Sequence, residues 1–125
     1  MYSSARGRMS VIIVLGLVIL SSSWLSAQDL GGNPDKGEAI YKEQCLRCHG
    51  RLGDGNGPDA ADLIVRPTNF HTVRSREKSD FEFLIAISNG VLFSPMHSWR
   101  GRLSDEQMVD VIHYIRALAP LKIVS

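Results

Sequence analysis

The 125-residue sequence has few cysteines, little net charge and no long apolar run. Its two cysteines are too few for a structural zinc site, which usually takes four Cys or His ligands in two spaced pairs. A formal net charge of +1 at pH 7 gives no indication of nucleic-acid binding or of attachment to a charged membrane surface. The length allows one domain at most, so we expect a single small globular unit.

The longest apolar stretch, residues 11–20, lies near the N-terminus behind two arginines. A helix of that length would span about 15 Å, half of a bilayer core of about 30 Å. Small residues up to Ala27 then offer a cleavage site. We expect residues 1–27 to be a signal peptide and 28–125 to be the folded domain. The alternative is an uncleaved anchor, and we expect membrane association only in that case.

Both cysteines belong to one motif, in which Cys45 and Cys48 are separated by two residues and followed at once by His49. This pattern is typical of covalent haem attachment, in which the thiols add to the haem vinyl groups and the histidine ligates the iron. Residues three apart lie on one side of a helical turn, so both sulfurs reach the same porphyrin edge. The motif predicts one covalent haem c, with His49 as the proximal iron ligand.

Two other uses of the cysteines are a redox dithiol and a metal site. A redox dithiol is expected after a strand in a βαβ unit. The preceding residues instead indicate a helix, with Asn33 as cap and Pro34 in the first position. Gly37 lies within this predicted helix, where glycine lowers helix stability. We therefore expect it to mark the close approach of another helix, although a merely tolerated glycine is an alternative.

Over residues 34–119 the sequence resembles the class I c-type cytochromes, which are small monohaem electron carriers. The motifs that carry this resemblance are Gly37–Tyr41, Cys45–His49, Gly53–Pro58, Gly90–Val91, Ser94–Met96 with Trp99, and the terminal helix around Tyr114. The resemblance implies an all-α, cytochrome c-like fold of three to five short helices around one covalently attached haem. It also implies redox partner proteins and no small-molecule substrate.

A glycine-rich loop, residues 53–58, follows the haem motif. It lacks the lysine and the following Ser or Thr of a phosphate-binding loop. By resemblance, the carbonyl of Pro58 holds the second ring nitrogen of His49, and Phe70 packs on the haem ring. We expect His71, just beyond, to be solvated rather than an iron ligand.

The residue opposite His49 decides whether the iron transfers electrons or binds small molecules. Met96 lies in a proline-bearing loop, and the resemblance makes it the distal iron ligand, with Trp99 packing near a haem propionate. Met108 lies on the apolar side of the last predicted helix, where core packing explains it. His97 stands where the family often carries proline, so a second histidine ligand or an open site remains an alternative.

Other helices are expected at 59–64, at 79–89 and from Ser104 to Pro120. Capping-box spacing marks the second and third of these. The apolar faces are predicted to hold Phe81, Leu84, Ile85 and Ile87 in the second, and Met108, Val111, Ile112, Ile115 and Leu118 in the third, with His113 solvated.

These residues together predict a periplasmic electron carrier, or a small haem subunit of a larger oxidoreductase or oxidase, rather than an enzyme. The alternatives are a gas-binding or peroxidase-like haem protein and a membrane-anchored cytochrome subunit. A basic rim that could attract an acidic redox partner comprises Arg66, Arg74, Arg76, Lys78, Arg100 and Arg102. An ordinary solvated surface explains the same charges equally well.

Overall fold

The computed structural model describes residues 30–120, and its regular elements are all helical. The predicted signal peptide therefore lies outside the described residues. In chain order the elements are α2 (Pro34–Ile40), the π-helical turn η2 (Tyr41–Cys45), α3 (Leu46–His49), the 3-10 turn η3 (Ala60–Asp62), α4 (Val73–Arg76), α5 (Asp80–Asn89) and α6 (Asp105–Leu118). The all-α prediction is confirmed. Within this part of the chain, no helix is long and apolar enough to cross a membrane.

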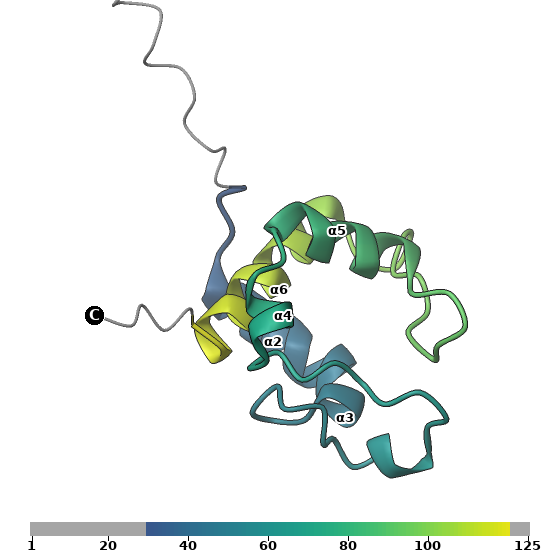
Figure 1. Cartoon of the computed structure of the whole chain (residues 1–125). Coiled ribbons are helices and arrows are strands. Elements are labelled where there is room, and N and C mark those ends of the chain that lie inside the picture. The colour runs from purple at the N-terminus through teal and green to yellow at the C-terminus, as the bar shows by residue number, and fades with distance from the viewer. Residues whose placement is uncertain (1–29, 121–125) are drawn as a thin grey trace, which may run out of the picture.

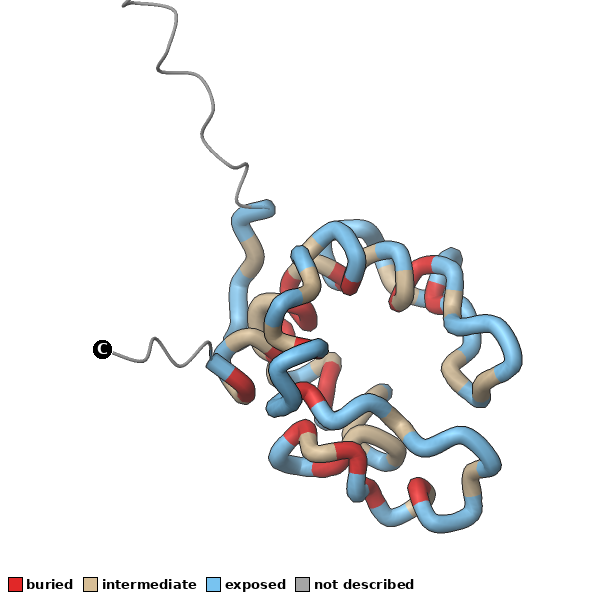
Figure 2. Tube along the Cα trace, in the orientation of Figure 1, coloured by how far each residue is buried: buried red, intermediate tan, exposed pale blue. Residues whose placement is uncertain are grey.

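Helices α2 and α6 cross in the middle of the molecule, between α5 on one side and α3 on the other (Figure 1). A Cβ atom added at Gly37 would lie 2.0 Å from the backbone oxygen of Asp110, so only glycine fits at this crossing. The predicted close helix approach is confirmed. Buried residues gather where the helices meet (Figure 2), and Tyr41, Met108, Val111 and Ile112 are the most deeply buried large side chains.

The start of α2 is tied to α6 through its cap. The Asn33 side chain accepts hydrogen bonds from the backbone of Asp35 and Lys36 at 2.9 and 3.1 Å, as expected of an N-cap. The Asn33 backbone N–H donates to the Asp110 carboxylate at 2.7 Å. Because Asp110 is buried, this bond fixes where α2 begins relative to α6.

A π-helical turn interrupts the first helix between α2 and the haem motif. An unbroken α-helix would place Gly37, Ile40, Tyr41, Gln44 and Cys48 on one face, and of these Gln44 is the one side chain beyond Tyr41 that the structure leaves exposed. The wider turn changes the angular spacing of the side chains, so Gln44 is exposed while Cys45 is partly buried. Tyr41 itself points inward, and its hydroxyl donates to the Gly50 carbonyl at 2.8 Å.

Helix α5 has the predicted capping box, formed by Ser79 and Glu82, but buries a different face from the one expected. Phe83 and Ile87 are buried, whereas Phe81 and Ile85 are 64% and 44% exposed. Apolar residues occur on both sides of this helix, so periodicity could not decide which side packs against α6. Only the assignment of Phe81 and Ile85 to the core is wrong.

Helix α6 is capped as predicted, by Ser104 and Gln107, and it buries four of the five residues expected on its apolar face, with Leu118 partly buried. Met108 is a core residue, as predicted. His113 is half-buried against the backbone of Gly32 rather than fully solvated. The helix expected at 59–64 is reduced to the single turn η3.

Candidate functional site

One cavity of about 230 Å³ opens between the segment that carries α3 and the segment that follows α5. Six of the seven predicted site residues line it, namely Cys45, Cys48, His49, Phe70, Met96 and Trp99, and His97 lines it too. Pro58 is absent from the lining. The fold thus gathers residues from three separate segments of the chain around one space.

The two thiols lie on α3 and on the π-helical turn before it, and both are partly buried. Burial, with a smaller contribution from Cys48, raises the pKa of the Cys45 thiol to about 12. A catalytic redox cysteine needs the opposite shift, toward the thiolate. This shift, together with the helical rather than strand context of the motif, argues against the redox dithiol. No cluster of three or more His, Cys, Asp or Glu suited to a metal ion occurs among the described residues.

His49 is held from two sides. Its Nδ1 lies 3.3 Å from the carbonyl oxygen of Thr68, and its ring stacks on Phe70 with centroids 4.9 Å apart and planes 13° apart. Burial lowers the pKa of the imidazole, although the Thr68 carbonyl opposes that shift. A neutral ring leaves Nε2 available to a metal, and the carbonyl at Nδ1 orients it.

The carbonyl beside Nδ1 was predicted to belong to Pro58, and the structure places Thr68 there instead. The glycine-rich loop is joined to α3 through backbone bonds from Gly55 N to His49 O at 2.9 Å and from Gly57 N to Cys48 O at 3.1 Å. A Cβ at Gly57 would lie 2.2 Å from the Arg47 carbonyl oxygen. This packing satisfies the end of α3 and leaves the next residue, Pro58, exposed. Nothing local to Thr68 in the sequence indicated its role.

Phe70 and Trp99 are buried, at 6% and 8% exposure, on the cavity wall. Phe70 packs on both His49 and Phe83, and the Phe83 ring centroid is 6.0 Å away. Trp99 lies beside His97, with ring centroids 4.5 Å apart. Contact of Phe70 and Trp99 with a haem stays a prediction.

Met96 reaches the cavity on the tight loop after α5. Its carbonyl accepts from Val91 N at 2.9 Å, and its own N–H donates to the Ser94 hydroxyl at 3.2 Å. Gly90 lies so close that a Cβ there would be 2.7 Å from the Met96 carbonyl oxygen. The loop is thus closed around Met96, which is partly buried, while His97 is exposed.

Other candidate side chains fall outside the site, and some unpredicted ones fall within it. His71 does not line the cavity and is exposed, with Nε2 2.6 Å from the Leu52 carbonyl. Lys78, predicted only as a surface charge, lines the cavity. Arg116 holds the backbone beside it, a role that the sequence did not suggest.

The lining fits a flat apolar cofactor with a central metal. Most of it is apolar, from residues such as Leu63, Phe70, Phe83 and Ile87. A neutral imidazole, a thioether and two thiols are the donors that haem iron and haem vinyl groups take in proteins. This donor set therefore suits a haem better than a free ion.

Residues 32–115 match the family model described as cytochrome c oxidase, cbb3-type, subunit III. The chain belongs to this family. It is a class I c-type cytochrome with a cytochrome c-like fold, a haem protein of electron transfer, as the motif predicted.

A chain of the reducing HAO-like protein complex of Kuenenia stuttgartiensis is similar to this cytochrome, with a TM-score of 0.63 and 26% sequence identity. The match covers 75% of the cytochrome but only 45% of that chain. No curated protein matches the sequence.

Proposed function

We propose that this cytochrome transfers electrons through one covalently attached haem c, bound by Cys45 and Cys48 and ligated by His49 and Met96. The observation that carries the proposal is that all four of these residues line one cavity. When bound, haem supplies an iron that exchanges one electron without forming a bond to a substrate.

The residues around the cavity would lower the reorganisation needed for electron exchange and raise the reduction potential. The Thr68 carbonyl and the Phe70 ring hold His49 in one orientation, so this side chain would need little reorganisation when a bound haem gains or loses an electron. A thioether ligand such as Met96 raises the reduction potential, and an apolar lining raises it further by disfavouring the ferric charge. His49 and Met96 would hold a bound haem from both sides and leave no position for a substrate, so we propose a carrier rather than an enzyme.

We propose that the partner is a larger oxidoreductase or oxidase, with the cytochrome acting as a diffusing carrier or as a small haem subunit. The description of its family as an oxidase subunit supports this, as does the similar chain within a redox complex. Val65 and Val91 line the cavity while remaining 43% and 47% exposed, which gives an apolar mouth for close approach. Arg66 and Lys78, the basic residues that line the cavity, would attract an acidic partner.

We propose a periplasmic location, because the N-terminal 27 residues have the charged start, the short apolar run and the small residues of a signal peptide. An anchored form facing the periplasm is the alternative. N-terminal sequencing of exported protein distinguishes them, since cleavage after Ala27 gives a chain that begins at Gln28.

A second candidate for the iron environment follows from His97, which lines the same cavity as Met96. A bis-histidine site would lower the potential, and an open site would bind gases or support peroxidase chemistry. Carbon monoxide binding by the reduced protein at neutral pH identifies the open site.

Covalent attachment is tested by denaturing the purified protein and measuring its mass and its haem spectrum. We expect wild type to retain one haem, and Cys45→Ala and Cys48→Ala each to retain a haem through one bond or to lose it. His71→Ala is the matched control, because that residue lies outside the cavity, and it should keep the haem. Release of haem from denatured wild type would contradict the proposal.

A further inference from the structure

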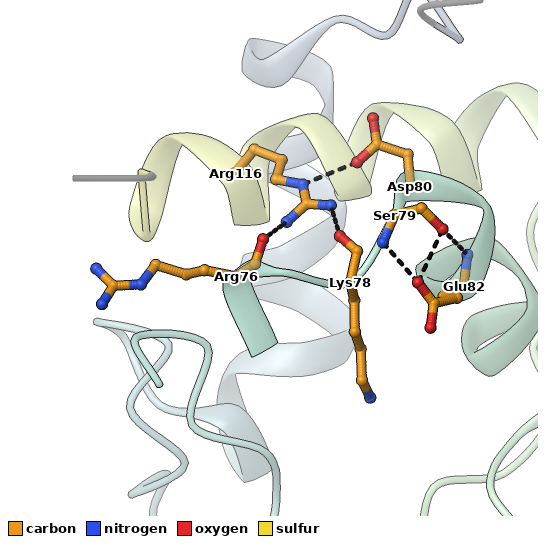
Figure 3. Close-up of polar contacts among 6 residues, drawn as sticks. All are labelled: Arg76, Lys78, Ser79, Asp80, Glu82 and Arg116. Atoms are coloured by element: carbon orange, nitrogen blue, oxygen red, sulfur yellow. Dashed lines mark hydrogen bonds and ion pairs between the residues drawn. The ribbon is translucent and has the colours of Figure 1, made fainter. Parts of the chain in front are cut away.

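Arg116 of α6 binds the short segment that connects α4 to α5. Its guanidinium donates to the backbone carbonyls of Arg76 and Lys78 and, at 2.8 Å from Nε, to the Asp80 carboxylate (Figure 3). The same group lies 4.7 Å from the centroid of the Phe83 ring. Only the planar fork of an arginine can make these contacts at once.

Lys78, one of the two residues whose carbonyls Arg116 binds, also lines the cavity. Figure 3 shows its side chain extending away from Arg116. Its ammonium makes no hydrogen bond or ion pair with another described side chain. Glu82, whose pKa the Lys78 charge helps to lower, is itself bound to Ser79.

The charges of the lining are of one sign. Among the described residues that line the cavity, none is an aspartate or glutamate, and the permanent charges are those of Lys78 and Arg66. Arg66 is exposed, whereas Lys78 is half-buried, so water screens the lysine less. A haem carries two carboxylates, and a carboxylate held beside an apolar cavity needs a cation or hydrogen bonds to offset its lost hydration.

We infer that Lys78 is the cation that pairs with the haem carboxylates, and that Arg116 is the positioning residue that sets it there. The inference rests on the proposed function, because it requires a haem in this cavity. It gives the connection between α4 and α5 a role in setting the reduction potential. A cation beside the haem disfavours the ferric form and keeps the haem carboxylates ionised.

The charged and titratable groups around Lys78 are few. Its charge acts on Glu82 of α5, and its backbone carbonyl is bound by Arg116 of α6, which also pairs with Asp80. Arg66, the two thiols and the imidazoles of His49 and His97 line the same cavity. Comparison of variants that leave all of these in place isolates the effect of Lys78.

The test is a set of equilibrium redox titrations of haem-loaded protein, from mildly acid to mildly alkaline pH, on wild type and Lys78→Gln. We expect Lys78→Gln to have a lower potential. We also expect a haem carboxylate to lose its proton at a higher pH in Lys78→Gln than in wild type, because no cation then stabilises its ionised form. Arg74→Gln is the matched control, since it removes the same charge from an exposed site on α4 outside the cavity.

Arg116→Lys tests the positioning role, because it keeps the charge and loses the fork. We expect it to shift the pH profile in the same direction as Lys78→Gln, beyond any loss of stability. Coincident profiles for Lys78→Gln and Arg74→Gln would overturn the inference, and an unshifted profile in Arg116→Lys would overturn the positioning role. Haem content is measured for every sample, so a wild type without haem contradicts the proposed function instead.

Discussion

Gly37 and Asp110 lie so close that a side chain on the first would put a carbon 2.0 Å from the carbonyl oxygen of the second. This contact sets the distance between α2 and α6. Helix α2 leads through the π-helical turn to the haem motif, and α6 supplies the core and Arg116. The geometry of the cavity therefore depends on this crossing.

Gly37→Ala is expected to destabilise the protein, although alanine favours a helix by about 1 kcal/mol over glycine. The clash is with backbone, which cannot rotate away, and overpacking of this kind costs about 1–3 kcal/mol or more. Guanidinium unfolding of the haem-loaded protein should give a lower midpoint. Ala39→Gly, at an exposed position of the same helix, is the control and should lose only about 1 kcal/mol. Equal stability of Gly37→Ala and wild type would show that the helices can separate freely.

Asp110→Ala should cost about 1–3 kcal/mol, because it removes the acceptor of the Asn33 backbone N–H from a buried position. Asp110→Asn keeps an oxygen at that place and is expected to retain most of the stability. Thermal unfolding of both variants checks this ordering. If the two lost the same stability, the negative charge rather than the hydrogen bond would be responsible.

The hydrogen bonds of Glu82 should make the stability of the protein sensitive to acid. Hydrogen bonds from the Ser79 backbone and side chain hold the pKa of Glu82 below its ordinary value of 4.5. A depressed pKa contributes stability above the unfolded-state value, and this contribution is lost as the pH falls through the folded-state value. Wild type should therefore lose more stability than Glu82→Gln on acidification below about pH 4.5. Glu77→Gln is the control and should track wild type, whereas a wild-type acid response in Glu82→Gln would contradict the assignment.

Much of this fold could be predicted because its signals are local. The caps at Asn33, Ser79 and Ser104 each depend on residues within one helical turn, and all three are confirmed. The haem motif is equally local. Gly37 was informative because glycine is costly inside a helix and needs a reason.

The remaining features arise from contacts between distant segments. Thr68 contributes a backbone carbonyl, which any residue type could supply, so its identity carries no signal. Helix α5 is apolar on both sides, and only its packing on α6 selects Phe83 over Phe81. From the sequence, Arg116 is an ordinary basic residue in the last turn of a helix. Its role follows only from its contacts with residues 76–80 in the folded protein.

The central claim is that Met96 is the distal ligand of a haem iron whose proximal ligand is His49. The direct measurement is the visible spectrum of the ferric protein, in which sulfur bound to ferric haem gives a weak band at the red end. We predict this band in wild type, its loss in Met96→Ala and its retention in Met108→Ala, since Met108 is buried in the core outside the cavity. A wild-type spectrum without the band, or a band that survives in Met96→Ala, would contradict the account.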